Sequence, residues 1–176
     1  MKRTNLLALL FAAALLAGCN NSQTAAPVQP SPSAENSLPT QAQPKLPTVK
    51  LYLGAETLAA EQALTWRQQE TGMMFRTNIQ DTDAMIFVFP QPYQAAFWMK
   101  NCPESISAAY IDPAGIIQEI HHLEKNDTNN VMAASTNIQY VLETSDGWFG
   151  RHHVNTGMVI RAENGSLQET YFKNQR

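Results

Sequence analysis

The feature of this sequence that most restricts its fold is a tight turn, Asp-Pro-Ala-Gly at residues 112–115, between two strand-length apolar segments at residues 106–111 and 116–122. Pro113 presets the backbone of such a turn, and Gly115 supplies the positive φ that it needs. The pattern therefore predicts a β-hairpin, in which the two segments pair with each other.

A helix signal interrupts the strand-like pattern near the start of the folded region. Thr65 is followed three residues later by Gln68, which is the spacing of a capping box. A short helix is therefore predicted at Trp66–Thr71. Gly72 stands where a left-handed C-cap would end it.

A second short helix is predicted further along, at residues 148–153. Ser145 or Asp146 is expected to cap its N-terminus. Trp148 and Phe149 are large apolar residues in its first turn, and we expect them to hold the helix on the sheet.

The other apolar segments have the length of strands, and turn residues separate them. Strands are expected at residues 49–53, 57–64, 84–89, 95–99, 138–143, 158–162 and 167–172. The chain shows no internal repeat and no regular alternation of strands with helices. The predicted fold class is all-β, a mainly antiparallel β-sandwich or squat barrel with two short α-helices.

The N-terminus has the organisation of a secretory signal. Basic residues at positions 2 and 3 precede an apolar run at residues 6–16 that is too short to span a bilayer. The run ends in Leu-Ala-Gly-Cys, which resembles the lipobox of bacterial lipoproteins. The resemblance implies removal of residues 1–18 and attachment of several acyl chains, palmitate among them, to Cys19, which would anchor the protein stably in a membrane. Asn20 instead of Asp after the cysteine favours the outer membrane, facing the periplasm, in a Gram-negative organism.

Composition divides the mature chain into a linker and one domain. Residues 19–47 consist mainly of Gln, Pro, Ser, Ala and Thr, which predicts a disordered tether. Residues 48–176 have the length of a single domain. The net charge of -3 comes without a basic run, which argues against nucleic-acid binding. If Cys19 carries lipid, Cys102 has no partner for an intramolecular disulfide.

Several motifs of the predicted domain resemble the domain of unknown function 192 family of bacteria and archaea. They are the stretches at residues 72–76, 85–90, 97–101, 141–143 and 147–152, together with Asp112 and Gly115. The resemblance implies a compact, mostly antiparallel β domain and brings no established activity. Two acids common in the family are absent, because Ser107 and Met158 stand in their places. Any proton-transfer role of those positions is therefore in doubt.

Four polar or aromatic residues form the candidate binding surface: Arg76, Trp98, Lys100 and Asn101. Trp offers a stacking plane, Arg a bidentate fork, and Lys and Asn hydrogen-bond donors, which together suit a small anionic ligand. An envelope protein is the other partner considered. The alternative is structural: Trp98 in the core, Arg76 paired with Asp81 or Asp83, and Asn101 in a turn.

Two further functions stay open from the sequence. A hydrolase or transferase of the envelope would use Lys100, a histidine or Cys102. A copper-binding protein would use soft ligands among Met73, Met74, Met85, Met99, Cys102 and the histidine pairs at residues 121–122 and 152–153. We assign no catalytic residue, cofactor or metal ligand. Arg151 is expected to pair with Glu143 or Asp146.

Overall fold

The computed structural model describes residues 37–173. The predicted signal peptide and the lipidation site Cys19 lie outside these residues. Within the described range the helices are α1 (Trp66–Thr71), α2 (Trp148–Arg151) and α3 (Leu167–Phe172). The strands are β1 (Thr48–Leu53), β2 (Glu56–Ala63), β3 (Ala84–Tyr93), β4 (Ala96–Phe97), β5 (Ile106–Ile111), β6 (Ile117–Leu123), β7 (Val131–Met132), β8 (Ile138–Ser145), β9 (Ile160–Ala162) and β10 (Gly165–Ser166).

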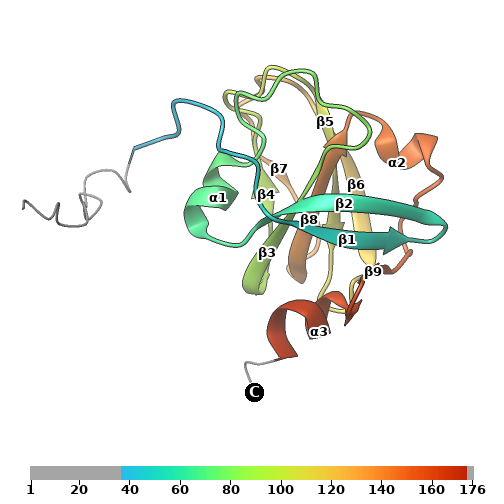
Figure 1. Ribbon diagram of the computed structural model, residues 1–176. Coiled ribbons are helices and arrows are strands. Elements are labelled where there is room, and N and C mark those ends of the chain that lie inside the picture. The colour runs from blue at the N-terminus through green and yellow to red at the C-terminus, as the bar shows by residue number, and fades with distance from the viewer. Residues whose placement is uncertain (1–36, 174–176) are drawn as a thin grey trace, which may run out of the picture.

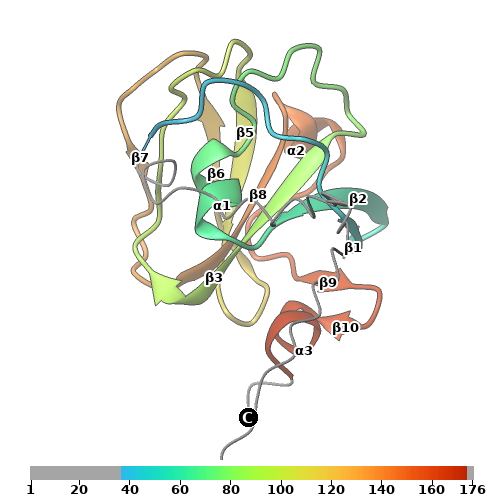
Figure 2. The ribbon, with the colours of Figure 1, turned by 60° about the vertical axis from the view of Figure 1, so that its left-hand side comes forward.

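Eight strands form one sheet that curls into a half-barrel (Figures 1 and 2). Their order is β10-β9-β1-β2-β3-β8-β5-β6, and β4 and β7 make a separate pair. Neighbouring strands are antiparallel except β2 and β3, which run parallel and are connected through α1. The predicted class of a mainly antiparallel β fold is confirmed. The predicted hairpins β1–β2 and β5–β6 are both present.

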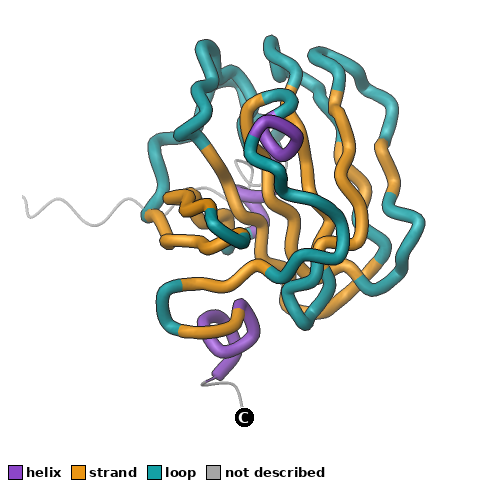
Figure 3. Tube along the Cα trace, turned by 90° about the vertical axis from the view of Figure 1, so that its right-hand side faces the viewer, coloured by secondary structure: helices purple, strands orange, loops and turns teal. Residues whose placement is uncertain are grey.

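The turn between β5 and β6 joins distant parts of the curled sheet. The Ile160 amide donates to the Gly115 carbonyl at 2.8 Å, and the Ile117 amide donates to the Met158 carbonyl at 2.9 Å. This contact brings β9 against the β5–β6 hairpin, and the resulting curl is visible in Figure 3. A Cβ on Gly115 would lie 2.8 Å from the Ile160 carbonyl oxygen, and the φ of Gly115 is +83°. Glycine is therefore required here by both the turn and the close approach.

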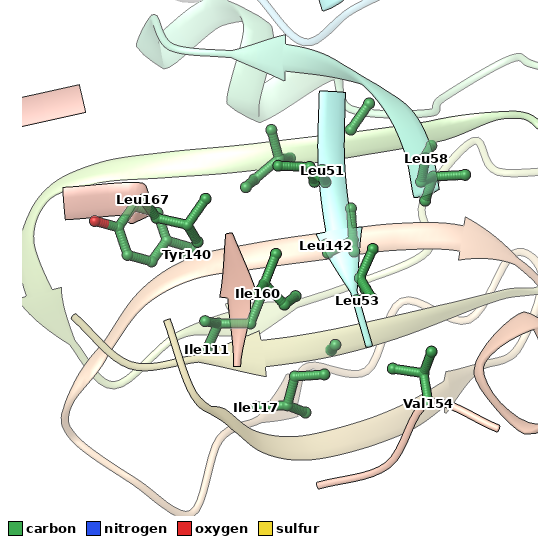
Figure 4. Close-up of a cluster of buried hydrophobic side chains, with 14 of the residues drawn as sticks. Leu51, Leu53, Leu58, Ile111, Ile117, Tyr140, Leu142, Val154, Ile160 and Leu167 are labelled. Atoms are coloured by element: carbon green, nitrogen blue, oxygen red, sulfur yellow. The ribbon is translucent and has the colours of Figure 1, made fainter. Parts of the chain in front are cut away.

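Alternating side chains of the central strands build a core on each face of the sheet. The first core contains Leu51, Leu53, Leu142, Ile160 and other residues shown in Figure 4. The second core lies on the opposite face and contains the buried side chains Met73, Met74, Met85, Phe87, Met99, Cys102, Tyr110 and Val141. Because β3, β5 and β8 supply both cores, β5 and β8 are buried along their whole length, and β3 is buried from Ala84 to Phe89.

Helix α1 has the predicted bounds and the predicted N-terminal capping box, but Gly72, with a ψ of -130°, is not left-handed helical, so the predicted left-handed C-cap is wrong. The Gln68 amide donates to the Thr65 hydroxyl, and the Thr65 amide donates to Oε1 of Gln68, which completes the capping box. Gly72 follows with a φ of +48°. Met73 and Met74 then enter the second core and attach the end of the helix to the sheet.

The predicted strand at residues 167–172 is wrong, because this segment is the helix α3. Ser166 and Glu169 form a second capping box, with the Ser166 hydroxyl accepting from the Glu169 amide. Leu167 is buried in the first core, and the rings of Tyr171 and Phe172 contact Tyr140. The fold thus has three short helices in the described residues, one more than predicted.

Two local predictions also need correction. Helix α2 begins after Gly147, which has a φ of +71°, and neither Ser145 nor Asp146 caps it with a side chain. The strand predicted at residues 95–99 is limited to Ala96–Phe97. Trp148 and Phe149 are buried in the first core, as expected of residues that hold α2 on the sheet.

The last part of the predicted linker is bound to the domain. The Gln43 side-chain amide donates to the Gly72 carbonyl at 2.8 Å and to the Gln68 carbonyl at 3.1 Å. The Leu46 amide donates to Glu61 at 2.8 Å. Ordered contacts therefore begin before residue 48. Among the described residues, no helix has the length and apolar character needed to cross a bilayer.

Candidate functional site

A cavity of about 400 Å³ opens beside α1, on the face of the second core. Helix α1 contributes one wall, and β3, β4 and the residues after β4 contribute another. Six aromatic side chains line it: Trp66, Phe87, Phe89, Tyr93, Phe97 and Trp98. We call this cavity the aromatic pocket.

The aromatic rings contact one another and give the pocket a preformed shape. Phe97 packs edge-on against Phe87 with 5.0 Å between ring centroids, and Phe89 packs edge-on against Tyr93 at 4.8 Å. Such edge-to-face pairs stabilise an arrangement beyond the area that they bury. Trp66 and Trp98 lie further out and are 63% and 36% exposed. The pocket therefore has buried aromatic walls and an exposed aromatic rim.

Glu143 is a carboxyl at the buried side of this pocket. It lies on the central strand β8, paired in register with Met85 of β3 and Ala108 of β5, and it is 5% exposed. Its Oε2 atom is fully buried and has no hydrogen-bond partner. Burial raises the pKa of Glu143 to about 8, although the charge of Arg76 acts in the opposite direction. The carboxyl is therefore mostly protonated at neutral pH.

Cys102 also lines the pocket, and its surroundings keep it unreactive. Burial, and then the charge of Glu143, raise the pKa of its thiol to about 12. Its Sγ atom contacts the Lys100 carbonyl at 3.7 Å. A buried, protonated thiol is a poor nucleophile.

His121, His122 and His152 each contact acids. His121 contacts Glu119 at 2.9 Å, and His122 contacts Asp146 at 2.7 Å. His152 lies between Glu56 and Asp81 and stacks on Trp148. Among residues 37–173 no hydrogen bond joins a histidine to the thiol, so the geometry offers no Cys–His pair.

Arg76 is engaged in a bidentate ion pair with Glu61. Its Nη1 and Nη2 atoms lie 2.6 Å and 2.8 Å from the two carboxylate oxygens, and the side chains are only 11% and 4% exposed. The partners considered from the sequence, Asp81 and Asp83, are wrong. Asp83 pairs with Lys45, and Asp81 pairs with Arg151.

The expected partner of Arg151 is likewise corrected. Its guanidinium contacts the Asp81 carboxylate at 2.6 Å and donates to the main-chain carbonyl of Asp146, also at 2.6 Å. Arg151, with Ser145 and His152, holds the pKa of Asp81 well below its ordinary value. Glu143 consequently has no arginine partner.

The four candidate binding residues do not converge on one surface. Trp98 lines the aromatic pocket, whereas Arg76 lines a separate cavity of about 240 Å³ beside Lys45 and Asp83. The Lys100 ammonium lies over the Trp98 ring, 5.3 Å from its centroid. Asn101 has a φ of +60°, and its carbonyl accepts from the Phe75 amide at 2.7 Å, so it serves a turn. Ligand binding by these four residues stays a prediction.

Sequence reasoning did not single out Glu143 as a pocket residue. The available signal was a lone acid in an otherwise apolar strand, Tyr140-Val141-Leu142-Glu143. It was interpreted as an ion-pair partner for Arg151. In the folded protein Arg76 and Arg151 are paired with other acids, and the buried Oε2 atom of Glu143 is left without a hydrogen bond.

The soft metal ligands considered from the sequence gather in the second core. Met73, Met74, Met85, Met99 and Cys102 are all buried there among aromatic and aliphatic side chains. Within residues 37–173, no group of three or more His, Cys, Asp or Glu is arranged to hold a metal ion. The methionines pack against the aromatic and aliphatic side chains of this core, and copper binding stays a prediction.

The fold and the aromatic pocket define the class of this protein as a small half-barrel β domain with an aromatic cavity on the face of its second core. The DUF192 family model, described as an uncharacterized ACR, matches residues 49–162. The chain belongs to this family. The resemblance noted in its sequence motifs is thus confirmed.

Two solved structures share this fold. A protein of unknown function from Novosphingobium aromaticivorans DSM 12444 is 26% identical, with a TM-score of 0.63, and the alignment covers 76% of this chain and 99% of that one. A protein from Sinorhizobium meliloti 1021, described as a proposed transcription regulator, is 25% identical, with a TM-score of 0.60, covering 65% and 92%. No curated protein matches the chain.

Proposed function

We propose that this protein is a lipid-anchored module of the cell envelope that binds a small organic ligand in the aromatic pocket and does not transform it. The size of the pocket supports the proposal, because about 400 Å³ falls within the range of small-molecule sites. Its composition also supports it, since such sites combine apolar walls with a few polar groups. The protonated thiol of Cys102 and the absence of a contacting histidine argue against nucleophilic chemistry at this place.

The unpaired oxygen of Glu143 is the observation that carries the proposal. A buried polar atom without a hydrogen bond costs about 1 to 3 kcal/mol, and native proteins hold few of them. A ligand in the pocket that supplies the missing hydrogen bond would recover part of this free energy. The carboxyl would thus orient the ligand by a hydrogen bond to its polar group, and the surrounding rings would contact its apolar part.

Placing the site in the aromatic pocket, and not around Arg76, changes the chemistry expected of the ligand. The candidate surface around Arg76 favours an anion, but Glu61 neutralises Arg76 in a buried ion pair. Among the described residues, the acids that line the aromatic pocket are Glu70, which is paired with Arg67, and Glu143, and no Lys, Arg or His lines it. Of the four residues selected from the sequence, Trp98 is the one that we retain in the site.

A fragment screen by ligand-observed NMR tests this site. We expect small aromatic and aliphatic fragments to bind the wild type and to lose most of their affinity in Trp66→Ala and Trp98→Ala. Both rings are exposed enough to be removed without unfolding the core. Val159→Ala is the control, because Val159 is an exposed apolar residue outside the pocket. Fragments that bind equally to all four proteins would exclude the aromatic pocket as the site.

The lipid anchor is tested separately, by metabolic labelling with an alkyne-bearing fatty acid. We expect wild-type protein to carry the label and to fractionate with the outer membrane of a Gram-negative host. Cys19→Ser should carry no label and leave the membrane fraction, whereas Cys102→Ser should behave as the wild type, because Cys102 is buried in the domain. Label on the Cys19→Ser protein would disprove this anchor.

A further inference from the structure

We propose, on the basis of the ligand-binding function above, that the ligand of the aromatic pocket is an organic cation whose ammonium group lies among the rings and against Glu143. The charges of the pocket are the first argument. The described lining residues include Glu70 and Glu143 but no Lys, Arg or His. Glu70 is paired with Arg67 at 2.7 Å, so Glu143 is the lining carboxyl that lacks a hydrogen-bonded counter-charge, and an ammonium group beside it would supply one.

The aromatic walls give the second argument. A ring attracts a cation to its face through its quadrupole, and ammonium ligands are commonly held by several such rings together. Trp98 already makes this interaction within the protein, since the Lys100 ammonium lies 5.3 Å from its ring centroid. Phe87, Phe89 and Phe97 extend the aromatic surface from this rim to the interior.

Glu143 supplies the third argument, because it is a buried acid with an oxygen that no protein group satisfies. Arg76, the nearest positive charge, is held by Glu61. Cys102 and Tyr110 are protonated neighbours, the strand partners Met85 and Ala108 are uncharged, and Glu70 lies across the pocket on α1. None of these neighbouring side chains acts as the counter-charge of this carboxyl, which leaves that role to a cationic ligand.

Binding of a cation is consequently coupled to loss of a proton. Without ligand the carboxyl is mostly protonated at neutral pH, because its pKa is raised to about 8. An ammonium group beside it favours the carboxylate, so the proton leaves to solvent as the cation enters. Below about pH 8, affinity for a permanently charged cation should then rise by about tenfold for each pH unit, and above that pH it should level off.

Isothermal titration of the full-length chain with benzyltrimethylammonium tests this ligand class. The matched probe is its uncharged isostere, in which a tert-butyl group replaces the trimethylammonium group. We expect the cation to bind at least about tenfold more tightly than the isostere at about pH 8 and to show the pH dependence above. Because this cation does not titrate, the pH dependence reports the protein alone.

Glu143→Gln is the matched variant, since it keeps the shape of the side chain and removes its charge. We expect it to lose the preference for the cation and the pH dependence, while the uncharged isostere binds as before. Its folding is checked by circular dichroism, and the comparison of the two probes on the wild type needs no variant at all.

The outcomes separate this inference from the function on which it depends. Equal binding of both probes, or a cation affinity that does not change with pH, overturns the cationic ligand. If the isostere alone binds, and Trp66→Ala or Trp98→Ala abolishes it, the pocket is a ligand site for neutral molecules and the proposed function stands. If neither probe binds, the proposal that the ligand is an organic cation is wrong. A fragment screen that is also negative then removes the site itself.

Discussion

Replacing Glu143 by Gln should change how the stability of this protein depends on pH. In the folded protein burial raises the pKa of the carboxyl to about 8, from an ordinary value of 4.5. Between these two values the folded state holds a proton that the unfolded state has lost. The wild type therefore has the full contribution of this group below about pH 4.5 and loses it progressively as the pH rises toward 8.

The size of the effect follows from the difference between the two pKa values. A shift of about three and a half units corresponds to about 5 kcal/mol, since one unit is worth about 1.4 kcal/mol. This is a large part of the stability of an ordinary domain, which is about 5 to 15 kcal/mol. Glutamine does not titrate, so Glu143→Gln should gain stability relative to the wild type as the pH rises.

Urea denaturation of both proteins at several pH values between about 5 and 9 measures this difference directly. Other titrating groups contribute equally to the two proteins and cancel in the comparison. We expect the free energy of unfolding of Glu143→Gln, relative to the wild type, to rise by several kcal/mol across this range. A difference that stays constant with pH would refute the reasoning.

Glu61→Gln is the matched control, because the same substitution should act with the opposite sign. Burial alone would raise the pKa of Glu61, but Arg76 and the Leu46 amide hold it below its ordinary value. The stability contributed by Glu61 is thus present above about pH 4.5 and is lost as the pH falls further. Glu61→Gln also leaves Arg76 buried without its partner, so we expect a loss of about 3 kcal/mol at neutral pH that diminishes in acid.

Three further predictions concern the fold. Gly115→Ala places a Cβ 2.8 Å from the Ile160 carbonyl oxygen at a positive φ, so urea denaturation should show a free energy of unfolding lower by about 1 to 3 kcal/mol. Gly150→Ala is the control and should not destabilise, because nothing lies within 4 Å of its Cβ. Equal effects of the two substitutions would contradict the close approach at Gly115. Ser166→Ala removes the hydroxyl that caps α3 and should cost about 1 kcal/mol in thermal unfolding, and an unchanged midpoint would disprove the cap. Cys102, whose pKa burial raises to about 12, should be alkylated slowly in native protein and quickly in urea, as followed by mass spectrometry; fast native alkylation would show that the thiol is accessible.

The local elements of this protein were largely predictable because their signals are close in sequence. The turn before Ile116 joins adjacent strands, and Thr65 and Gln68 lie within one helical turn. The error at Leu167–Phe172 has a similar local origin. The capping box of Ser166 and Glu169 was present, but the apolar and aromatic residues after it were interpreted as a strand.

The ion pairs were harder to predict because they connect elements that are distant in the chain. Arg76 reaches Glu61 on β2, although Asp81 and Asp83 are closer in sequence. Arg151 reaches Asp81 across seventy residues. Parallel pairing of β2 with β3 brings Arg76 near Glu61, and antiparallel pairing of β3 with β8 brings Asp81 near Arg151; no local pattern specifies either pairing.

The sequence alone shows that a single acid, Glu143, follows the apolar residues Tyr140–Leu142, and that Trp66 begins a short helix. Only the tertiary structure decides what these residues do together. It pairs Arg76 with Glu61 and Arg151 with Asp81. It also places Trp66 and Trp98 in the lining of one cavity and buries the Glu143 oxygen without a hydrogen-bond partner. The physical reason is that the pKa and the hydrogen bonds of a buried acid depend on every charge around it, and the folded chain collects those charges from several distant elements.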